Sequence, residues 1–416
     1  MARTVWAGVD AGKSAHHCVV IDADGEQLLS RRVDNDEKAL GDLIAAVGDL
    51  AEGGEVTWAI DLNSGGGALL ISLLIGTGQR LLYIPGRTVY HASAGYRGDG
   101  KSDAKDAAVI ADQARMRRDL QPLRPGDDIA VDLQLLTARR GDLVADRTRA
   151  INRLRAVLLE IFPALERAFD YSGSKAALLL LTRYQTPEAI RRTGRARLEA
   201  WLRNHKARNA SAVAQTAIEA ANQQHIQVRG QQVAVSIVAR LAKEVMALDD
   251  EITTTETLIE ERFLCHRHAE ILTSMPGFGV ILAAEFLAAT GGDMAVFGTV
   301  DRLAGVAGLA PVPKDSGRVS GNLHRPRHYS RRLLRSCYLA AQVAARRDPD
   351  SHVYYQRKRA DGKTHVQAVI ALARRRLNVQ WAMLRDHKPY APLCSRNPNA
   401  HSRLTTPRSK RDATRT

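Results

Sequence analysis

Short apolar runs separated by polar turns fill the first 90 residues of the chain. β-Branched and aliphatic residues gather in these runs, and Asp-Ala-Gly or Asp-Gly turns separate them, which favours strands. Strands are predicted at residues 3–12, 16–25, 27–34, 55–61 and 79–86. Helices are predicted at residues 35–50, 66–78 and 103–116, because apolar residues there recur on one helical face. The pattern therefore predicts an α/β domain with a mixed sheet over residues 1–125.

Two long helical patterns follow, over residues 127–162 and 230–263. The second places Val238, Val245, Ile252 and Ile259 seven residues apart, with Leu241, Leu248 and Thr255 at the complementary spacing. Two interleaved repeats of seven predict a coiled-coil seam. An intramolecular helical hairpin and an interface between subunits explain this seam equally well. We therefore predict a helical, coiled-coil region over residues 126–264.

An all-α domain is predicted over residues 265–390. Within it, a Pro-Gly-Phe-Gly joint at residues 276–279 connects two apolar helical stretches and resembles a helix-hairpin-helix turn. Such a turn can present backbone N–H groups to a phosphate, and a packed helical turn is the alternative. Residues 391–416 are rich in bases and have no apolar period, which predicts a disordered basic tail.

Composition and charge favour a polyanionic partner. The chain has 416 residues, 45% of them hydrophobic, which is enough for two or three domains. Its net charge is +15, and residues 1–112 carry 16 acids and 10 bases whereas the rest carries 29 acids and 50 bases. This positive region favours nucleic acid or an anionic membrane surface as partner. No apolar run reaches the length of a membrane span and no signal peptide is recognisable, so we expect a cytoplasmic protein without a membrane partner.

Four aspartates occupy the ends of predicted elements in the α/β domain. Asp10 and Asp61 end strands, and Asp103 and Asp106 lie three residues apart in the first turn of a helix. Each alone also fits a turn former or a helix cap. Together they form a cluster whose mutual repulsion a hard cation such as Mg²⁺ relieves. We therefore predict that these four carboxylates bind Mg²⁺.

Residues 311–336 combine a turn with a field of arginines. The segment Lys-Asp-Ser-Gly, which ends at Gly317, predicts a turn that exposes Ser316. No acidic residue occurs from Ser316 to Arg347. Guanidinium groups match the geometry of phosphate. The predicted phosphate-binding residues are Arg318, Arg325, Arg327, Arg331, Arg332 and Arg335.

Four motifs occur together in a defined order: GVDAGK, AIDLNSGGG, GDGKSDAKDAAVIADQAR, and MPGFG followed by AGLAPVPKDSGRVSG. With these motifs, most of the chain resembles the IS-one-ten family of insertion-sequence transposases. The resemblance implies a RuvC-like, RNase H-like DEDD domain followed by a C-terminal transposase domain. It also implies a recombinase that a structured bridge RNA guides, and that cuts and rejoins donor and target DNA through a serine. Asp61 is a departure, because the family often has glutamate there.

The resemblance assigns Ser316 as the nucleophile, with Ser320 as the competing candidate. A serine hydroxyl attacks a phosphodiester only with a nearby base or metal and with positive charge for the developing oxyanion. Because the aspartates and Ser316 are far apart in the sequence, we expect a composite active site, within one chain or across a homo-oligomer. Two other functions remain open: a junction-resolving nuclease that hydrolyses DNA through its metal site, and a non-catalytic nucleic-acid scaffold.

Overall fold

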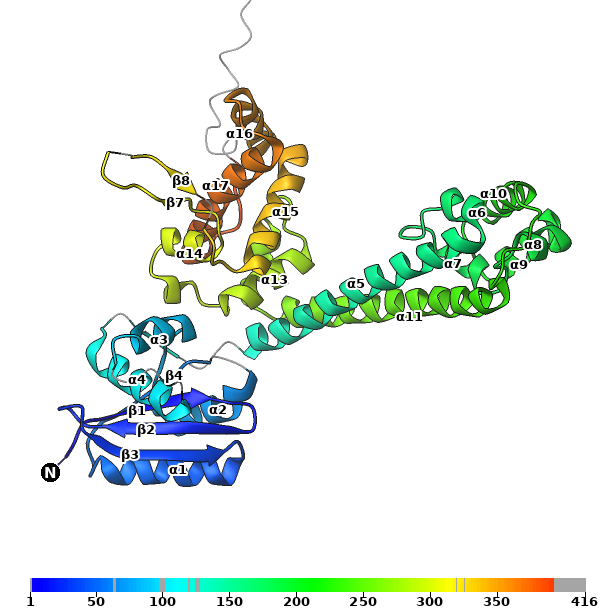
Figure 1. The fold of residues 1–416 in the computed structure, drawn as a ribbon. Coiled ribbons are helices and arrows are strands. Elements are labelled where there is room, and N and C mark those ends of the chain that lie inside the picture. Colours follow the sequence, from blue (N-terminus) through cyan, green and yellow to red (C-terminus); the bar gives the residue numbers. More distant parts are fainter. Residues whose placement is uncertain are drawn as a thin grey trace, which may run out of the picture. The chain divides into compact units, whose positions relative to one another are not determined.

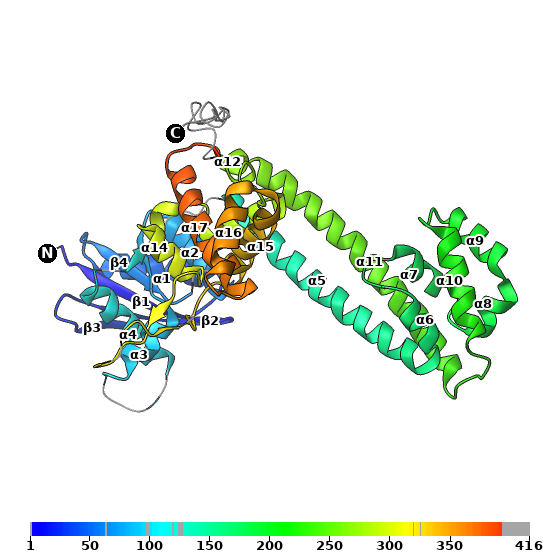
Figure 2. The same ribbon diagram turned by 90° about the horizontal axis from the view of Figure 1, so that it is seen from above.

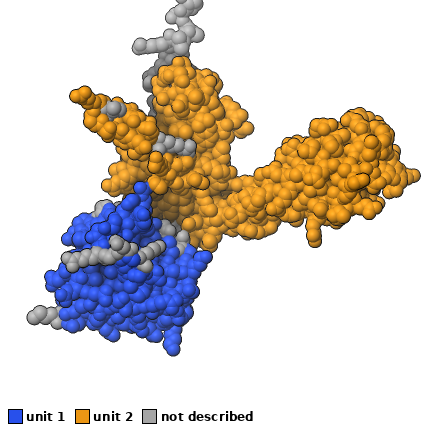
Figure 3. Space-filling model, viewed as in Figure 1, with its two compact units in different colours: residues 1–127 blue, residues 128–416 orange. Residues whose placement is uncertain are grey.

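The computed structural model describes residues 2–62, 65–96, 100, 102–118, 120–123, 128–318, 320–324 and 326–392. It contains two compact units, residues 1–127 and residues 128–416 (Figure 3). The four-part division predicted from the sequence is finer than these units and stays a prediction. Most of the predicted basic tail, residues 393–416, lies outside the described residues. Among the helices of the described part, none combines the length and the hydrophobicity needed to cross a bilayer.

A mixed sheet forms the centre of the first unit (Figure 1). Its strands are β1 (Val5–Ala11), β2 (Ala15–Ile21), β3 (Gln27–Asp34), β4 (Val56–Ile60), β5 (Arg80–Tyr83) and β6 (Gln121–Pro122), in the order β3-β2-β1-β4-β5-β6. β1 runs antiparallel to β2 and parallel to β4, and β5 is parallel to β4. The predicted α/β domain is confirmed, and its arrangement is consistent with an RNase H-like fold. The sequence does not predict the short β6.

Helices cover both faces of this sheet. They are α1 (Glu37–Leu50), α2 (Ala68–Gly76) after the 3₁₀ turn η1 (Gly65–Gly67), α3 (Gly86–Ser93) and α4 (Asp103–Met116). Successive strand residues point to opposite faces, so Val20 packs into the cluster with α1 and α2, whereas Val19 and Ile21 pack with α4. The sequence does not predict α3, in which Val89 is the buried side chain.

Two antiparallel helices, α5 (Asp128–Ile161) and α11 (Gln231–Leu264), lie side by side in the second unit (Figures 1 and 2). Ion pairs join their polar edges: Arg139–Glu251, Arg140–Glu256, Arg147–Asp249 and Arg262–Asp132. These arginines are therefore neutralised within the chain and are not left over for a polyanion.

The seven-residue seam of α11 packs against other helices of the same chain. Val238 and Val245 are fully buried and belong to one hydrophobic cluster with Leu154 and Leu158 of α5. This arrangement is the intramolecular hairpin, one of the two alternatives for the seam. The prediction of a coiled coil is not supported, because the described residues show a helical hairpin and short helices instead.

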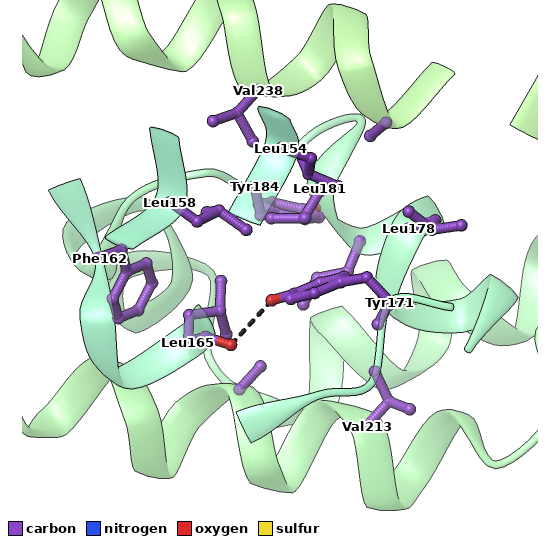
Figure 4. Close-up of a cluster of buried hydrophobic side chains, with 14 of the residues drawn as sticks. Leu154, Leu158, Phe162, Leu165, Tyr171, Leu178, Leu181, Tyr184, Val213 and Val238 are labelled. Atoms are coloured by element: carbon purple, nitrogen blue, oxygen red, sulfur yellow. Dashed lines mark hydrogen bonds between the residues drawn. The ribbon is translucent and has the colours of Figure 1, made fainter. Parts of the chain in front are cut away.

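A lobe of short helices closes the far end of the hairpin. It contains α6 (Pro163–Ala168), α7 (Lys175–Leu181), α8 (Pro187–Thr193), α9 (Arg195–Asn204) and α10 (Ala210–Asn222). In its core the hydroxyl of Tyr171 donates to the carbonyl oxygen of Leu165 at 2.8 Å, among Leu158, Phe162 and Leu178 (Figure 4). Because this cluster includes residues of α5 and α11, the lobe and the hairpin share one core.

The rest of the second unit is mostly helical. Its elements are α12 (Ala269–Thr273), α13 (Val280–Thr290), η2 (Met294–Phe297), α14 (Val300–Val306), α15 (Arg331–Arg347), α16 (Pro349–Ala360) and α17 (His365–Arg385). A two-stranded arm, β7 (Val312–Pro313) and β8 (Leu323–His324), projects from these helices between α14 and α15 (Figure 1).

The Pro-Gly-Phe-Gly joint is a tightly packed turn. Gly277 has a φ of +84°, and a Cβ there would lie 2.3 Å from the carbonyl oxygen of Ala340 on α15. Phe278 is 5% exposed, and Arg376 of α17 donates to the carbonyl oxygen of Pro276. Through this turn, α12 and α13 pack against α15 and α17. It matches the packed-turn alternative to a phosphate-binding helix-hairpin-helix.

Candidate active site and nucleic-acid interface

Asp10 and Asp61 lie at one edge of the sheet. Asp10 is the second-to-last residue of β1, and Asp61 directly follows β4. The two strands are parallel neighbours with Val9 opposite Ile60. The residue after each of these two is an aspartate, Asp10 or Asp61. The N–H of Ala11 donates to Oδ1 of Asp61 at 3.2 Å. The strand register therefore places Asp10 and Asp61 next to each other, as the sequence leads us to expect.

Asp106 approaches the same edge from α4. This helix packs closely on β1, because a Cβ on Gly8 would lie 2.3 Å from the carbonyl oxygen of Ala107. A cavity of about 370 Å³ opens there, and the polar side chains that line it are Asp10, Asp61, Tyr90, Ser93, Lys105 and Asp106. Asp103 lies in the first turn of α4, is exposed, and is not among the residues that line the cavity. The structure thus brings three of the four predicted carboxylates to one cavity.

The carboxylates in this cavity interact electrostatically. Burial raises the pKa of Asp61 above its ordinary value, and the charge of Asp106 acts in the same direction. The N–H of Ala11 opposes this shift by donating to the carboxylate. A raised pKa in a partly buried pair of acids means that negative charge is costly here, and a bound cation removes that cost.

The oxygen atoms of these carboxylates are suitable ligands for Mg²⁺. Within the described residues, no three His, Cys, Asp or Glu side chains are close enough together to hold a metal ion. Mg²⁺ does not need such a cage, since it is commonly held by one or two carboxylates and keeps several waters. The cavity therefore fits a water-rich site on a pair of carboxylates better than a closed site made of protein ligands.

Ser316 lies in the exposed loop of the β7–β8 arm. The N–H of Lys314 donates to the carbonyl oxygen of Asn322 at 2.9 Å, and the N–H of Asn322 donates to Oδ1 of Asp315 at 3.0 Å. Ser316 and Ser320 are both exposed, and each precedes a glycine with a left-handed φ, +54° and +79° respectively. Both candidate hydroxyls are thus accessible on turns, and the choice of Ser316 stays a prediction.

Most of the predicted phosphate-binding arginines are exposed. These are Arg318, Arg327, Arg331, Arg332 and Arg335, whereas Arg325 lies outside the described residues. Arg331 and Arg332 occupy the first turn of α15, next to the cap that Ser330 forms with the N–H of Leu333. Basic side chains at the positive end of a helix repel its dipole, so an anion bound there is favoured. The start of α15 therefore suits a phosphate group.

Arg335 differs from the other arginines. Its Nη1 donates to both carboxylate oxygens of Glu285 on α13, and the Glu285 side chain is only 8% exposed. The predicted phosphate-binding role of Arg335 therefore competes with an ion pair inside the protein.

Three of the polar side chains that line the carboxylate cavity are not predicted as site residues from the sequence. Tyr90 and Ser93 lie on α3, a helix that the hydrophobic pattern does not indicate. Lys105 is the one with a recognisable signal, because it stands between Asp103 and Asp106 in the sequence. A positively charged side chain beside clustered acids offsets part of their negative charge, and Lys105 is placed to do so in this cavity.

A carboxylate cavity on an α/β unit and a basic arm on a helical unit are features typical of enzymes that process nucleic acid. The chain belongs to the IS110/IS116/IS900 family of insertion-element transposases. Residues 7–163 match a family model described as a transposase, of the IS110 DEDD type, and residues 269–356 match the transposase IS116/IS110/IS902 family.

Relatives match nearly end to end. A protein of insertion element IS900 from Mycobacterium paratuberculosis is 70% identical over 392 residues, which is 94% of this chain and 98% of the relative. A protein of IS116 from Streptomyces clavuligerus is 50% identical over 388 residues, 93% of this chain and 96% of the relative. A protein of IS110 from Streptomyces coelicolor is 38% identical over 387 residues, 92% and 94% of the two chains. The resemblance seen in the sequence is confirmed.

Proposed function

We propose that this transposase is an RNA-guided DNA recombinase that cuts and rejoins DNA through a covalent bond to Ser316. The observation that carries the proposal is the exposure of Ser316 on a turn of the β7–β8 arm, in a segment rich in exposed arginines. Family membership supplies the reaction class, a DNA transposition. A bridge RNA as guide and a serine as nucleophile are what the motifs imply.

In the proposed step, Oγ of Ser316 attacks the phosphorus of a DNA phosphodiester. A P–Oγ bond forms, the bond from phosphorus to one sugar oxygen breaks, and that oxygen leaves with a proton as a free hydroxyl. The proton of Oγ passes to a base in the active site. Attack by the hydroxyl of a second strand then restores Ser316, so rejoining needs no external energy source. Arg318 and the two arginines at the start of α15 stabilise the charge on the phosphate oxygens.

We assign the carboxylates a metal-binding role in this reaction. Mg²⁺ would bind among Asp10, Asp61, Asp103 and Asp106, held by one or two of these carboxylates and its own waters, and would supply a Lewis acid for a phosphodiester oxygen. The cavity that Asp10, Asp61 and Asp106 share supports this role. Asp103 lies one turn away on the same helix, is exposed, and does not line that cavity.

A second candidate function follows from the same cavity. Paired carboxylates that bind a divalent cation also suit direct hydrolysis of DNA by water, as in a junction-resolving nuclease. The two functions differ in their products, because hydrolysis leaves free ends whereas the serine route rejoins strands. A homo-oligomer with a composite site is compatible with both.

The test is strand exchange with purified components. The protein is incubated with the end of its own element, a target DNA, the RNA transcribed from the element, and Mg²⁺. We expect recombinant DNA only when all components are present. Free cut ends without rejoined product would favour the nuclease, and full activity without RNA would remove the guide from the proposal.

A further inference from the structure

A cavity of about 350 Å³ lies between α16 and α17, apart from the β7–β8 arm. Its wall combines apolar side chains, among them Val353 and Val379, with Tyr354, one acid, Asp350, and three arginines, Arg357, Arg375 and Arg376. Volumes of this order are typical of sites for small ligands. Neither the serine arm nor the carboxylate cavity includes any of these residues.

Three cations surround the ring of Tyr354 at the cavity. The guanidinium carbons of Arg357 and Arg375 lie 5.1 and 4.9 Å from the ring centroid, and Nζ of Lys358 lies 5.8 Å from it. Lys358 also pairs with Asp361 at 2.8 Å. Within the described residues, Arg357 and Arg375 form no ion pair. Both guanidinium groups line the cavity and contact the same ring by cation–π interactions.

Arg376 is a buried arginine in the lining of the cavity. It is 5% exposed, Nη1 donates to Oγ of Ser351 at 3.1 Å, and Nη2 donates to the carbonyl oxygen of Pro276. Asp348 lies 4.0 Å away, at the limit of an ion pair, and Nε has no hydrogen-bond partner in the described part of the chain. A buried guanidinium that is incompletely compensated adds positive potential to the cavity.

We propose that this cavity binds one nucleotide of a single strand of nucleic acid, with Arg357 and Arg375 holding its phosphate. Guanidinium groups match the oxygens of a phosphate, and their contacts with the ring of Tyr354 position the two arginines at the cavity before binding. The apolar wall at Val353 and Val379 suits the face of a base. The choice of a nucleotide over another phosphate ester rests on the proposed function.

The test measures binding of a labelled single-stranded oligonucleotide by fluorescence anisotropy, over a series of salt concentrations and without divalent metal. The full chain carries Ser316→Ala, so catalysis plays no part. The variant Arg357→Gln with Arg375→Gln is compared with Arg346→Gln and Arg359→Gln, which removes two exposed charges from α15 and α16. We expect the cavity variant to bind at least tenfold more weakly than this control. Its salt dependence should fall by about 0.7 in slope, because the two arginines hold one phosphate and roughly 0.7 is lost for each phosphate contact on a single strand.

A second variant keeps every charge. Val379→Trp fills the cavity from its partly exposed wall and should weaken binding as well, with the circular dichroism spectrum unchanged. If both cavity variants bind the strand and 5′-deoxyadenosine monophosphate as the control does, the proposal is overturned. If only binding of the mononucleotide depends on the cavity, the site is kept and its source is a free nucleotide. Failure here leaves strand exchange through Ser316 untouched, because the two are measured separately.

Discussion

Nη1 of Arg335 donates to both carboxylate oxygens of Glu285, and this ion pair joins α15 to α13. Glu285 is 8% exposed at its side chain, and its other basic neighbour, Arg140, is 3.9 Å away. Arg335→Gln should therefore lower the free energy of unfolding by about 1–3 kcal/mol, because it leaves a nearly buried carboxylate short of a partner. Urea unfolding followed by circular dichroism measures this change.

Arg332→Gln is the matched control, since it removes the same charge from an exposed position on the same helix. Its unfolding free energy should stay within about 0.5 kcal/mol of the parent, while its DNA binding weakens. If the two variants have equal free energies of unfolding, the ion pair with Glu285 does not stabilise the fold.

Asparagine in place of a carboxylate should stop recombination. The variants are Asp10→Asn, Asp61→Asn, Asp103→Asn and Asp106→Asn. Each removes one negative charge from the proposed Mg²⁺ site, so recombinant product should fall at least a hundredfold, on the order of a lost catalytic group. RNA should still co-purify, because the positive surface is unchanged. Asp42→Asn, at an exposed position of α1, should recombine normally, and full activity of Asp106→Asn would contradict the metal site.

The helical hairpin predicts how α11 responds to a buried charge. Val245 is fully buried inside the single chain, so Val245→Glu should cost several kcal/mol of stability, about 3 or more. Val233 on the same helix is 67% exposed, and Val233→Glu should change little. Urea unfolding and light scattering are both measured. A smaller particle with intact stability would mean that the seam joins subunits instead.

The packed turn at Gly277 gives a test of the C-terminal fold. Gly277→Ala places a methyl group against the carbonyl of Ala340 and forces a φ of +84° on alanine, so stability should fall by about 2 kcal/mol or more. Gly279→Ala adds the same methyl group where nothing lies within 4 Å and φ is −79°. Thermal unfolding should separate the two variants clearly. Similar melting of both would contradict the close approach to α15.

The sequence predicts the strand ends better than the contacts between distant helices. Asp10 and Asp61 could be placed together because the alternating apolar runs determine where β1 and β4 end, and parallel neighbours share an edge. The ion pair of Arg335 could not be predicted, since its partner Glu285 is 50 residues away and looks like any other acid in the sequence. The pattern of residues determines the elements, whereas such pairings depend on how the helices pack.

The turn at Gly277 shows the same limit. A glycine-rich joint between helices serves equally for binding phosphate and for close packing, because both need a backbone without a side chain. Only the position of Ala340, on a helix that follows much later in the chain, distinguishes them. α3 is a different case: its buried side chain is Val89, so no apolar period marks the helix that carries Tyr90 and Ser93.

The covalent bond between Ser316 and DNA is the central claim, and mass spectrometry of a denatured reaction tests it most directly. The protein is incubated with DNA, RNA and Mg²⁺, denatured, digested, and searched for a peptide that carries a nucleotide. We predict an adduct on Ser316, its complete loss together with all recombinant product in Ser316→Ala, and its persistence in Ser320→Ala. An adduct on Ser320 would move the nucleophile by four residues. Normal recombination by both variants, without any adduct, would contradict the serine mechanism altogether.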